Sequence, residues 1–519
     1  MATEKVQPCG AGTPKVLVYM IDAARADVLE AVNHPIWQKL KANRWQDGYN
    51  AAWSLTAAIE PYAETNSGPN HVTIATGMLL RNHHVAYNDT MWSFNNAATP
   101  TWIDRLGRKF PDMRTIYAFS WLPDLALMAD HGRHDIVCGT DEYNNEALVA
   151  LLKRSDSPSA VMVYDGMPDT MGHEYGFYPY GDEYFKAADD SLSRLGNLLD
   201  VIRTSPTFPE ENWLIVICAD HGGMGFRHGI RGGQASTVPL LYCSKTIKGG
   251  EIVGYPNIVD IAAQVLRHFG MDEEVAELDG QAELQVAPPN SERPTVEKLI
   301  YDLSVVNGRI VNTAPDGEKY AVTACDGLSF DAGGIDLGSG CLALDALKGF
   351  SGEAFTFALK IKGDFSKIEG EQVIFSNKDC TKATLPGFAL TAEKGVYWPM
   401  TKGKNRISFH SGCHGAPTTY VVPKSDRMDL GDVLIGDGEE TLVAVSIDKA
   451  GIITVFQHSY DTGRSYWLCN GASGINPWSQ LPWNLGQDGT GKYKTPTVAK
   501  ISGFRFWTRA LTIDELLKL

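Results

Sequence analysis

The chain has 519 residues, of which 44% are hydrophobic and 21% are charged, a composition typical of a globular protein with more than one domain. Its net charge of -16 excludes a nucleic-acid binder that works by general electrostatic attraction, although a bound metal ion can reverse the sign of the charge at a local site. Since no run of about eighteen apolar residues occurs, we expect no transmembrane segment.

The start of the chain and its cysteines bear on the cellular compartment. Residues 1–10, MATEKVQPCG, lack the basic, apolar and small-residue pattern of a secretory leader, which predicts a cytoplasmic protein. A secreted or periplasmic protein is the alternative, because removal of a leader would leave the same start. The nine cysteines are scattered without a C-x-x-C pair and predict mostly reduced, buried thiols rather than a disulfide framework.

In the first half of the chain, apolar runs alternate with helical patterns. Residues 15–22 (KVLVYMID), 159–165 (SAVMVYD) and 212–220 (NWLIVICAD) are unbroken apolar runs that each end in an aspartate. Continuous hydrophobicity predicts strands covered on both faces, as in a parallel sheet. Residues 183–202 have the three- and four-residue spacing of an amphipathic helix. The alternation predicts an α/β domain over 1–285, with a mostly parallel sheet sandwiched by helices.

The second half has a different pattern. The proline-rich, polar segment 286–298 is predicted to be a linker. Beyond it, residues 354–363, 441–448 and 451–458 alternate between apolar and polar side chains and are separated by glycine turns. This alternation predicts antiparallel strands, and hence a β-sandwich domain over 299–519.

The end of the chain resembles a known module. Its last strand and helix, ISGFRFWTRALTIDEL, resemble those that close LamG-like, concanavalin-like jelly rolls. The resemblance implies a module that recognises glycans or docks against a catalytic domain. A structural or oligomerisation role is an alternative, and the oligomeric state is not predicted. Four tryptophans either stack on sugar rings or pack in the core: Trp398, Trp467, Trp478 and Trp483.

Metal-ligand side chains follow the predicted strands of the first half. Strands of an open α/β sheet deliver functional groups at their carboxyl ends. Each Asp–His pair is unspecific by itself, because aspartate is also common in turns. Zinc accepts imidazole and carboxylate ligands together, and manganese accepts the same set. The candidate ligands, enough for two ions that hold the oxygens of a phosphoryl transfer, are Asp22, Asp169, His173, Asp220, His221 and His228.

A hydroxyl precedes another predicted helix. The stretch 65–73 reads TNSGPNHVT and places Ser67 two residues before Pro69, which suits a first helical turn. Ser67 is either a helix cap or a nucleophile in the anion-attracting field of the helix N-terminus, and the two roles are compatible. Thr65 is a rival nucleophile close by.

Five segments together resemble a known superfamily: SGPNH (67–71), ATGM (75–78), HHVAYND (83–89), PDTMGH (168–173) and ADHGGM (219–224). They resemble the alkaline phosphatase superfamily, and within it the type I phosphodiesterase/nucleotide pyrophosphatase branch. The resemblance runs from about Lys15 to Leu241. It implies an alkaline phosphatase-like fold for the first domain and a metal-dependent hydrolase of phosphoric ester bonds.

The resemblance also implies roles for individual residues. Asp169, His173 and His228 would hold one zinc ion. Asp22, Asp220 and His221 would hold the other, together with the oxygen of Ser67, which would be both a metal ligand and the nucleophile that forms a phosphoseryl intermediate. Asn88 matches the asparagine that binds a phosphoryl oxygen, and Asp165 matches an acid that orients a ligand histidine. Aromatic residues near the motifs either bind a stackable leaving group or pack the domain: Tyr87, Trp92, Tyr175, Phe177 and Tyr178.

The pattern departs from that branch in two places. Serine stands at position 67 where the branch usually has threonine, and His228 follows ADHG after a much shorter interval. The sequence after His228, HGIRGGQASTVPL, is similar to the phosphomutase and phosphatase members of the superfamily. The absence of C-x-P-S-R argues against a sulfatase.

The sequence therefore favours a di-zinc phosphodiesterase with a serine nucleophile, acting on phosphodiesters or phosphonates, including glycan- or lipid-linked ones. A phosphomonoesterase or phosphomutase is the alternative, with Arg25, Arg227 and Arg231 as candidates for a basic clamp on a second substrate group. A glycan-binding protein with an inactive metal-binding domain is the alternative of another class.

Overall fold

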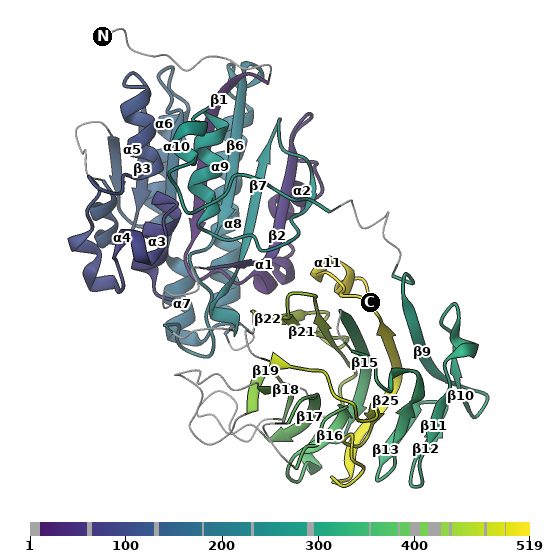
Figure 1. Cartoon of the computed structure of the whole chain (residues 1–519). Coiled ribbons are helices and arrows are strands. Elements are labelled where there is room, and N and C mark those ends of the chain that lie inside the picture. Colours follow the sequence, from purple (N-terminus) through teal and green to yellow (C-terminus); the bar gives the residue numbers. More distant parts are fainter. Residues whose placement is uncertain are drawn as a thin grey trace. The chain divides into compact units, whose positions relative to one another are not determined.

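The structure is a computed structural model of the whole chain, shown in Figure 1. Contacts divide it into two compact units, Met1–Pro289 and Asn290–Leu519, and each is described by itself. The residues that the structure describes are 11–59, 65–128, 134–178, 181–229, 233–287, 295–351, 354–381, 385–394, 405–413, 427–434, 438–471, 475–493 and 495–519.

The N-terminal unit is built on an eight-stranded mixed sheet. Only β7 runs antiparallel to its neighbours, and the other pairs of adjacent strands are parallel. The mostly parallel sheet predicted from the sequence is thereby confirmed. In spatial order the strands are β4 (His134–Cys138), β3 (Thr115–Phe119), β5 (Ala160–Asp165), β1 (Thr13–Ile21), β6 (Glu211–Cys218), β7 (Thr237–Ser244), β2 (Asn50–Ala58) and β8 (Gly250–Glu251).

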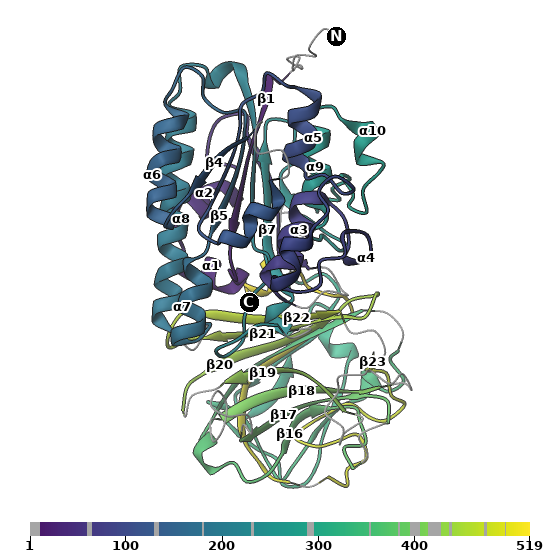
Figure 2. The same ribbon diagram turned by 90° about the vertical axis from the view of Figure 1, so that its left-hand side faces the viewer.

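Helices cover both faces of this sheet, as Figure 2 shows. The long helix α8 contacts β1 and also contacts the other helices on the same face of the sheet. On the other face, α9 contacts β6. One group consists of α1 (Ala26–Val32), α2 (Pro35–Lys41), α6 (Asp141–Leu152), α7 (Met167–Tyr175) and α8 (Asp182–Arg203). The other consists of α3 (Ser67–Thr76), α4 (Leu80–His83), α5 (Trp102–Lys109), α9 (Asp260–His268) and α10 (Asp272–Val275).

The elements form where the residue patterns predict them. The central strands β1, β5 and β6 are buried along nearly their whole length, because helices cover them on both sides. Helix α8 buries Tyr184, Ala188, Leu192, Leu195 and Leu199, which recur at three- and four-residue steps. Two short 3-10 helices, η1 (Asn88–Ser93) and η2 (Leu122–Leu127), contact α3 and complete the layer around it.

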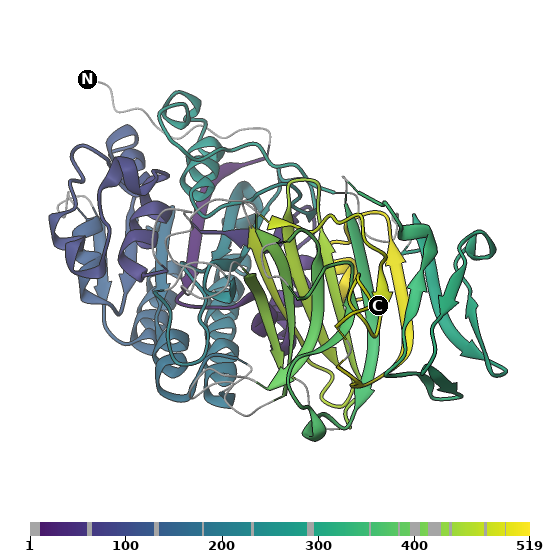
Figure 3. The same ribbon diagram turned by 60° about the horizontal axis from the view of Figure 1, so that its bottom comes forward.

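The C-terminal unit consists of two antiparallel sheets, whose strands Figure 3 shows. The first contains, in order, β10 (Arg309–Asn312), β9 (Leu299–Val306), β25 (Thr497–Trp507), β15 (Phe355–Gly363), β20 (Thr441–Ile447), β21 (Ile452–Ser459) and β22 (Ser465–Gly471). In addition, β13 (Gly334–Gly338) pairs with β25, and β12 (Ser329–Asp331) pairs with β13. The second contains β11 (Val322–Ala324), β14 (Leu342–Leu344), β24 (Asn484–Leu485), β16 (Gln372–Ser376), β17 (Phe388–Lys394), β18 (Asn405–Cys413) and β19 (Arg427–Leu434), with β23 (Ile475–Asn476) beside β18. The short helix α11 (Ile513–Leu516) closes the chain.

An aromatic core joins the two sheets and confirms the predicted sandwich. The Phe357 ring of β15 lies 4.8 Å from the ring of Phe375 on β16 and 5.4 Å from that of Phe388 on β17, measured between centroids. Trp483 is fully buried among these phenylalanines, and Trp467 is also buried. These two tryptophans are therefore core residues and do not offer rings to a sugar. Trp478 is half-buried against Phe350 and Phe355, and Trp398 lies outside the described residues.

A disulfide bond links Cys325, which follows β11, to Cys341, which precedes β14. The expectation of mostly reduced thiols did not include this bond. The two cysteines are 16 residues apart and become neighbours through the pairing of β11 with β14. The free cysteines among the described residues are Cys138, Cys218, Cys243, Cys380 and Cys469, of which Cys138 is exposed. In the described part of the chain, no helix is both long and apolar enough to cross a membrane.

Replacing both Cys325 and Cys341 with serine should destabilise the C-terminal unit. Because the bond closes a loop with a sequence separation of 16, the free energy of unfolding is expected to fall by about 3 kcal/mol. Urea unfolding of the full chain, followed by tryptophan fluorescence with and without reductant, measures this change. Cys138→Ser in the other unit is the control. A C-terminal transition that does not respond to reductant would contradict the prediction.

Candidate active site

The carboxyl ends of neighbouring parallel strands bring three predicted ligands together. β1 lies between β5 and β6 in parallel register, so Asp22 after β1 and Asp220 after β6 emerge at the same edge of the sheet. The Nε2 atom of His221 lies 3.5 Å from Asp22 Oδ1 and 3.2 Å from Asp220 Oδ2. All three side chains are buried, and their ligand atoms lie within 4.8 Å of one another.

A second group forms around Asp169 on helix α7. The Oδ1 atom of Asp169 lies 3.4 Å from Nε2 of His228, and both residues cluster with His221 in a second set of ligand atoms within 4.8 Å. The third predicted ligand of this group, His173, lies one helical turn after Asp169, with its Nε2 atom 3.5 Å from Asp169 Oδ1. The opposite nitrogen of His173, Nδ1, is 3.1 Å from the carbonyl oxygen of Phe226. All six predicted ligands therefore lie in one region.

The chemistry of this region fits metal ions. Among the described residues, three buried carboxylate oxygens have no hydrogen-bond partner: Asp22 Oδ1, Asp169 Oδ1 and Asp220 Oδ2. Burial, together with the charges of Asp220 and Asp169, raises the pKa of Asp22, as expected of carboxylates crowded without a cation. Burial lowers the pKa of His221, and burial with the proximity of His221 lowers the pKa of His228 to about 4. Both imidazoles are therefore neutral at pH 7, as metal ligands must be.

Ser67 opens helix α3 beside this cluster. The helix begins at Ser67 and Asn66 occupies the cap position, so the predicted capping role of Ser67 is wrong. The Ser67 hydroxyl is buried, and its Oγ atom lies 3.2 Å from Nε2 of His221. It thus lies at the N-terminus of α3, the positive end of the helix dipole, which favours bound anions.

Asn88 lies against the first turn of α3. Its Oδ1 atom accepts a hydrogen bond of 2.8 Å from the backbone N–H of Gly68, which leaves the amide nitrogen of Asn88 to donate to a substrate oxygen. The approach is close, because a Cβ atom added to Gly68 would meet Met91 Cγ at 2.9 Å and Asn88 Cα at 3.0 Å. A glycine after the candidate nucleophile therefore lets η1 dock on the helix.

The other candidate nucleophile, the hydroxyl of Thr65, takes part in hydrogen bonding to the loop that carries His228. Its Oγ1 atom accepts a hydrogen bond of 2.7 Å from the backbone N–H of Gly229, and its carbonyl oxygen contacts Nδ1 of His228. Thr65 therefore anchors the loop that carries a candidate metal ligand, and this geometry favours Ser67 over Thr65 as the nucleophile.

Three groups outside the cluster that contact the candidate metal ligands were not predicted from the sequence. The hydroxyl of Tyr164 donates to Asp22 Oδ2 at 2.6 Å, and the backbone N–H of Ala23 donates to Asp220 Oδ1 at 3.1 Å. His71, within the SGPNH segment, lies 3.2 Å from Asp220 Oδ2 through its Nε2 atom. Position in a motif was the only sequence signal for His71, whereas Tyr164 read as an ordinary buried strand residue.

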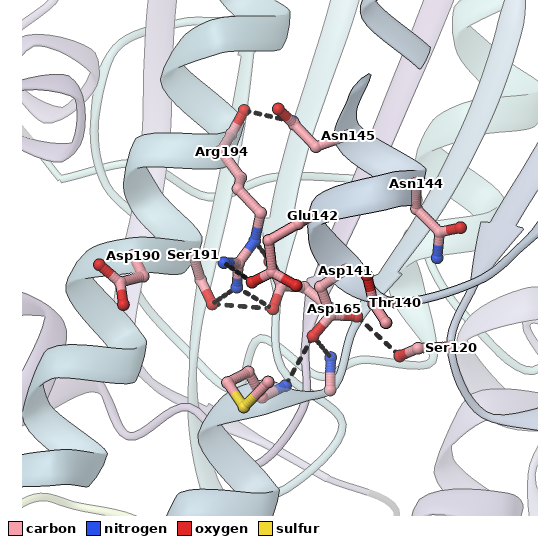
Figure 4. A network of polar contacts seen from close by, with 12 residues as sticks. Ser120, Thr140, Asp141, Glu142, Asn144, Asn145, Asp165, Asp190, Ser191 and Arg194 are labelled. Carbon is pink, nitrogen blue, oxygen red and sulfur yellow. Dashed lines mark hydrogen bonds and ion pairs between the residues drawn. The ribbon is translucent and has the colours of Figure 1, made fainter. Parts of the chain in front are cut away.

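Asp165 does not orient a ligand histidine. Figure 4 shows its carboxylate paired with Arg194 of helix α8, whose Nε and Nη2 atoms lie 2.8 and 2.7 Å from Asp165 Oδ2 and Oδ1. Hydroxyl groups of Ser191 and Tyr19 donate to the same carboxylate at 2.9 and 2.7 Å. The implied role is therefore corrected: a strand-end aspartate preceding α7 ties β5 to α8 instead.

Another buried carboxylate caps the helix that carries Asp169. Asp141 of α6 accepts hydrogen bonds through Oδ2 from the N–H groups of Gly166 and Met167, at 3.1 and 2.9 Å, as Figure 4 shows. These N–H groups belong to the unpaired donors at the N-terminus of α7. Asp141 thereby fixes the start of α7, two residues before the candidate ligand.

Asp141→Asn should change the pH dependence of stability. Burial, and then the charge of Asp165, raise the pKa of Asp141 to about 6, against about 3.9 in the unfolded chain. The folded state therefore holds a proton that the unfolded chain releases, and stability is lost as pH rises towards 6, by up to about 3 kcal/mol. The melting temperature of Asp141→Asn minus that of the wild type should therefore increase from pH 4.5 to pH 7.5. The C-terminal transition is the internal control, and a difference that stays constant with pH would contradict the prediction.

The five aromatic residues considered as substrate contacts differ in their exposure to solvent. Tyr87 and Tyr175 are 52% and 41% exposed, and Trp92 is 57% exposed. Phe177 and Tyr178 are buried and so pack the domain.

Of the candidate basic clamp, Arg25 is buried, with its Nε and Nη2 atoms 3.0 and 2.6 Å from the carboxylate of Asp27. It therefore supports the local fold instead of facing a substrate. Arg227 is exposed, and Arg231 lies outside the described residues.

Part of the chain is similar to two proteins of known name. No family model matches the chain. It is 23% identical over 247 residues to human ectonucleotide pyrophosphatase/phosphodiesterase family member 1, which covers 41% of this chain and 24% of that protein. It is also 23% identical over 237 residues to bis(5'-adenosyl)-triphosphatase enpp4 of Xenopus laevis, covering 41% of this chain and 48% of the relative. The chain thus spans less than half the length of either relative.

Two of the solved structures similar to part of this chain are an ectonucleotide pyrophosphatase/phosphodiesterase and an alkaline phosphatase superfamily protein. Murine ectonucleotide pyrophosphatase/phosphodiesterase 5 is 15% identical, with a TM-score of 0.39 over 53% of this chain and 97% of that chain. An alkaline phosphatase superfamily protein from Vibrio parahaemolyticus is 13% identical, with a TM-score of 0.37 over 65% of this chain and 78% of that chain.

Proposed function

We propose that the protein is a metal-dependent phosphoester hydrolase that cleaves phosphodiesters through a serine nucleophile. The observation that carries the proposal is the placement of the Ser67 hydroxyl at the N-terminus of α3, 3.2 Å from His221, in the same region as three buried carboxylate oxygens that have no hydrogen-bond partner among the described residues. The relatives are named as a pyrophosphatase/phosphodiesterase and a triphosphatase, which favours the same class of substrate.

The site residues divide the work between metal binding and chemistry. Asp169, His173 and His228 would hold one zinc ion, and Asp22, Asp220 and His221 the other, with His221 close enough to both groups to set the distance between them. Two zinc ions held there would lower the pKa of the Ser67 hydroxyl and neutralise charge on the phosphoryl group. Manganese suits the same ligands.

The chain's own groups then carry out a two-step transfer. Ser67 Oγ attacks phosphorus as one ester bond breaks, and the leaving oxygen departs as an alcohol with the proton that Ser67 gives up. The phosphoryl group on Ser67 still carries the second ester group. Water then attacks the same phosphorus, the bond to Ser67 Oγ breaks, and one proton of the water restores the Ser67 hydroxyl as the phosphate monoester is released. The amide nitrogen of Asn88 would donate to one of the remaining phosphoryl oxygens, whose charge grows in each transition state.

The leaving group is proposed to be organic. Tyr87 precedes Asn88 directly and is half exposed, and Tyr175 ends the helix that carries Asp169. Exposed aromatic faces at these positions suit a planar or apolar leaving group better than inorganic phosphate. A phosphomutase is less favoured, since Arg25 is already paired with Asp27.

The proposal extends to the cellular compartment. The disulfide bond between Cys325 and Cys341 favours a protein that works in an oxidising compartment over a cytoplasmic one.

The C-terminal unit is proposed to be a LamG-like module with a docking or structural role. Two of the tryptophans considered as sugar-binding residues, Trp467 and Trp483, are buried, which disfavours sugar binding through their rings.

The test compares two substrates with the same chromophore. Initial rates of the purified full chain with zinc are measured on bis-p-nitrophenyl phosphate and on p-nitrophenyl phosphate, with a chelated sample as the control. A preference for the diester that chelation abolishes is expected. A preference for the monoester would move the assignment to a phosphatase or phosphomutase, and zinc binding without turnover of any phosphoester would favour an inactive metal-binding domain.

A further inference from the structure

His71 is a buried histidine between two carboxylates. It lies on α3, one turn after Ser67, and its side chain is fully buried. Its Nδ1 atom lies 2.7 Å from Asp124 Oδ1, and its Nε2 atom lies 3.2 Å from Asp220 Oδ2. Each ring nitrogen therefore faces a carboxylate oxygen, one of which belongs to a candidate metal ligand.

The side of His71 away from the metal cluster is rigidly held. Asp124, on η2, is fully buried, and its second oxygen accepts a hydrogen bond of 2.7 Å from the hydroxyl of Tyr117 on β3. The rings of Trp121 and His71 are nearly perpendicular with a centroid distance of 5.4 Å, and the Tyr164 ring lies 5.1 Å from the imidazole. These contacts limit rotation of the imidazole, so its Nε2 atom stays close to Asp220 Oδ2.

Asp220 is the ligand that depends on this contact. Its Oδ1 atom accepts from the backbone N–H of Ala23, while its Oδ2 atom lies 3.2 Å from both His71 Nε2 and His221 Nε2. His71 is absent from the groups of described residues whose ligand atoms gather within 4.8 Å. It therefore touches Asp220 from outside the cluster of ligands.

We propose that His71 and Asp124 are positioning residues that fix Asp220 Oδ2 for metal binding and tie the metal site to the helix of the nucleophile. The inference rests on the proposed metal site. Partners behind a metal ligand orient it, and their loss typically weakens metal binding 10- to 100-fold. Because Ser67 and His71 belong to one helix, the contact with Asp220 also sets the distance from the nucleophile to the strand end of β6.

The chain supplies a matched control pair. His134 and Asp104 are also a fully buried histidine and aspartate, with Nε2 2.7 Å from Oδ1. His134 Nδ1 lies within hydrogen-bond distance of Thr115 Oγ1, and Asp104 Oδ2 accepts a hydrogen bond of 2.7 Å from the hydroxyl of Thr101. Neither threonine is a candidate metal ligand. Removing this pair costs a buried His–Asp contact without touching the site.

The experiment measures zinc affinity of the full chain by competition with a chromophoric chelator. His71→Phe keeps a ring of similar size and removes both donors, and Asp124→Asn is the milder change. Both are expected to weaken zinc binding about 10- to 100-fold. His134→Phe and Asp104→Asn are expected to stay within about twofold of the wild type, since neither contacts a ligand. Melting of the metal-free proteins reports the stability cost of each variant.

The outcomes separate the two proposals. Wild-type affinity in both Asp124→Asn and His71→Phe, or an equal loss in His134→Phe, would overturn the positioning role. A wild-type chain that binds no zinc would overturn the metal site itself, and this inference with it. If His71→Phe does not fold, Asp124→Asn against Asp104→Asn decides the question, because these two changes conserve volume.

Discussion

Replacing Ser67 with alanine is expected to lower kcat on a phosphodiester by at least about 1,000-fold, because the variant lacks the oxygen that attacks phosphorus. Zinc affinity should change only a few-fold, since the carboxylate and imidazole ligands of both groups remain in place. Steady-state kinetics with bis-p-nitrophenyl phosphate, alongside chelator competition, measures both quantities.

Two further variants make this result specific to Ser67. Ser67→Thr keeps the hydroxyl and should retain part of the activity. Thr65→Val removes the acceptor of the Gly229 N–H group, so it should act on metal binding through His228 instead of abolishing the nucleophile. Full loss in Thr65→Val with substantial activity in Ser67→Ala would contradict the assignment and make Thr65 the nucleophile.

Removal of zinc is expected to abolish turnover and to lower the melting temperature of the N-terminal unit. The buried carboxylates of Asp22, Asp169 and Asp220 repel one another without a cation, so binding favours the folded state. At a zinc concentration about 100 times its Kd, the stabilisation is about 2.7 kcal/mol. Calorimetry of the full chain with zinc and with a chelator measures the shift.

The variant Asp220→Asn is the reference for this measurement, because the C-terminal unit has a cluster of possible metal ligands of its own, Glu371, Glu393 and His410. Asp220→Asn should abolish most of the zinc-dependent shift of the N-terminal transition. An unchanged shift of that transition in Asp220→Asn would contradict the predicted site.

The architecture followed closely from the residue patterns. The apolar runs that end at Asp22, Asp165 and Asp220 became β1, β5 and β6, because an unbroken apolar run leaves a strand no stable place except the middle of a covered sheet. The 183–202 pattern became α8 within one residue at either end. The alternating segments of the second half became paired strands of a sandwich for the same kind of reason.

Residue identity and order also determined the candidate ligands, because few side chains hold zinc and the carboxyl ends of parallel strands converge. Only the tertiary structure decided which carboxylates face the cluster. Asp165 pairs with Ile21 in the register of β1 and β5, one residue short of Asp22, so its side chain points to the opposite face of the sheet from that of Asp22. There Arg194, 29 residues further along the chain, binds its carboxylate. His71, Asp124 and Asp141 gained their roles from elements far apart in sequence, and the Cys325–Cys341 bond arose from strand pairing. Local patterns specify strands, helices and ligand types, whereas the contacts between side chains of different elements exist only after those elements pack.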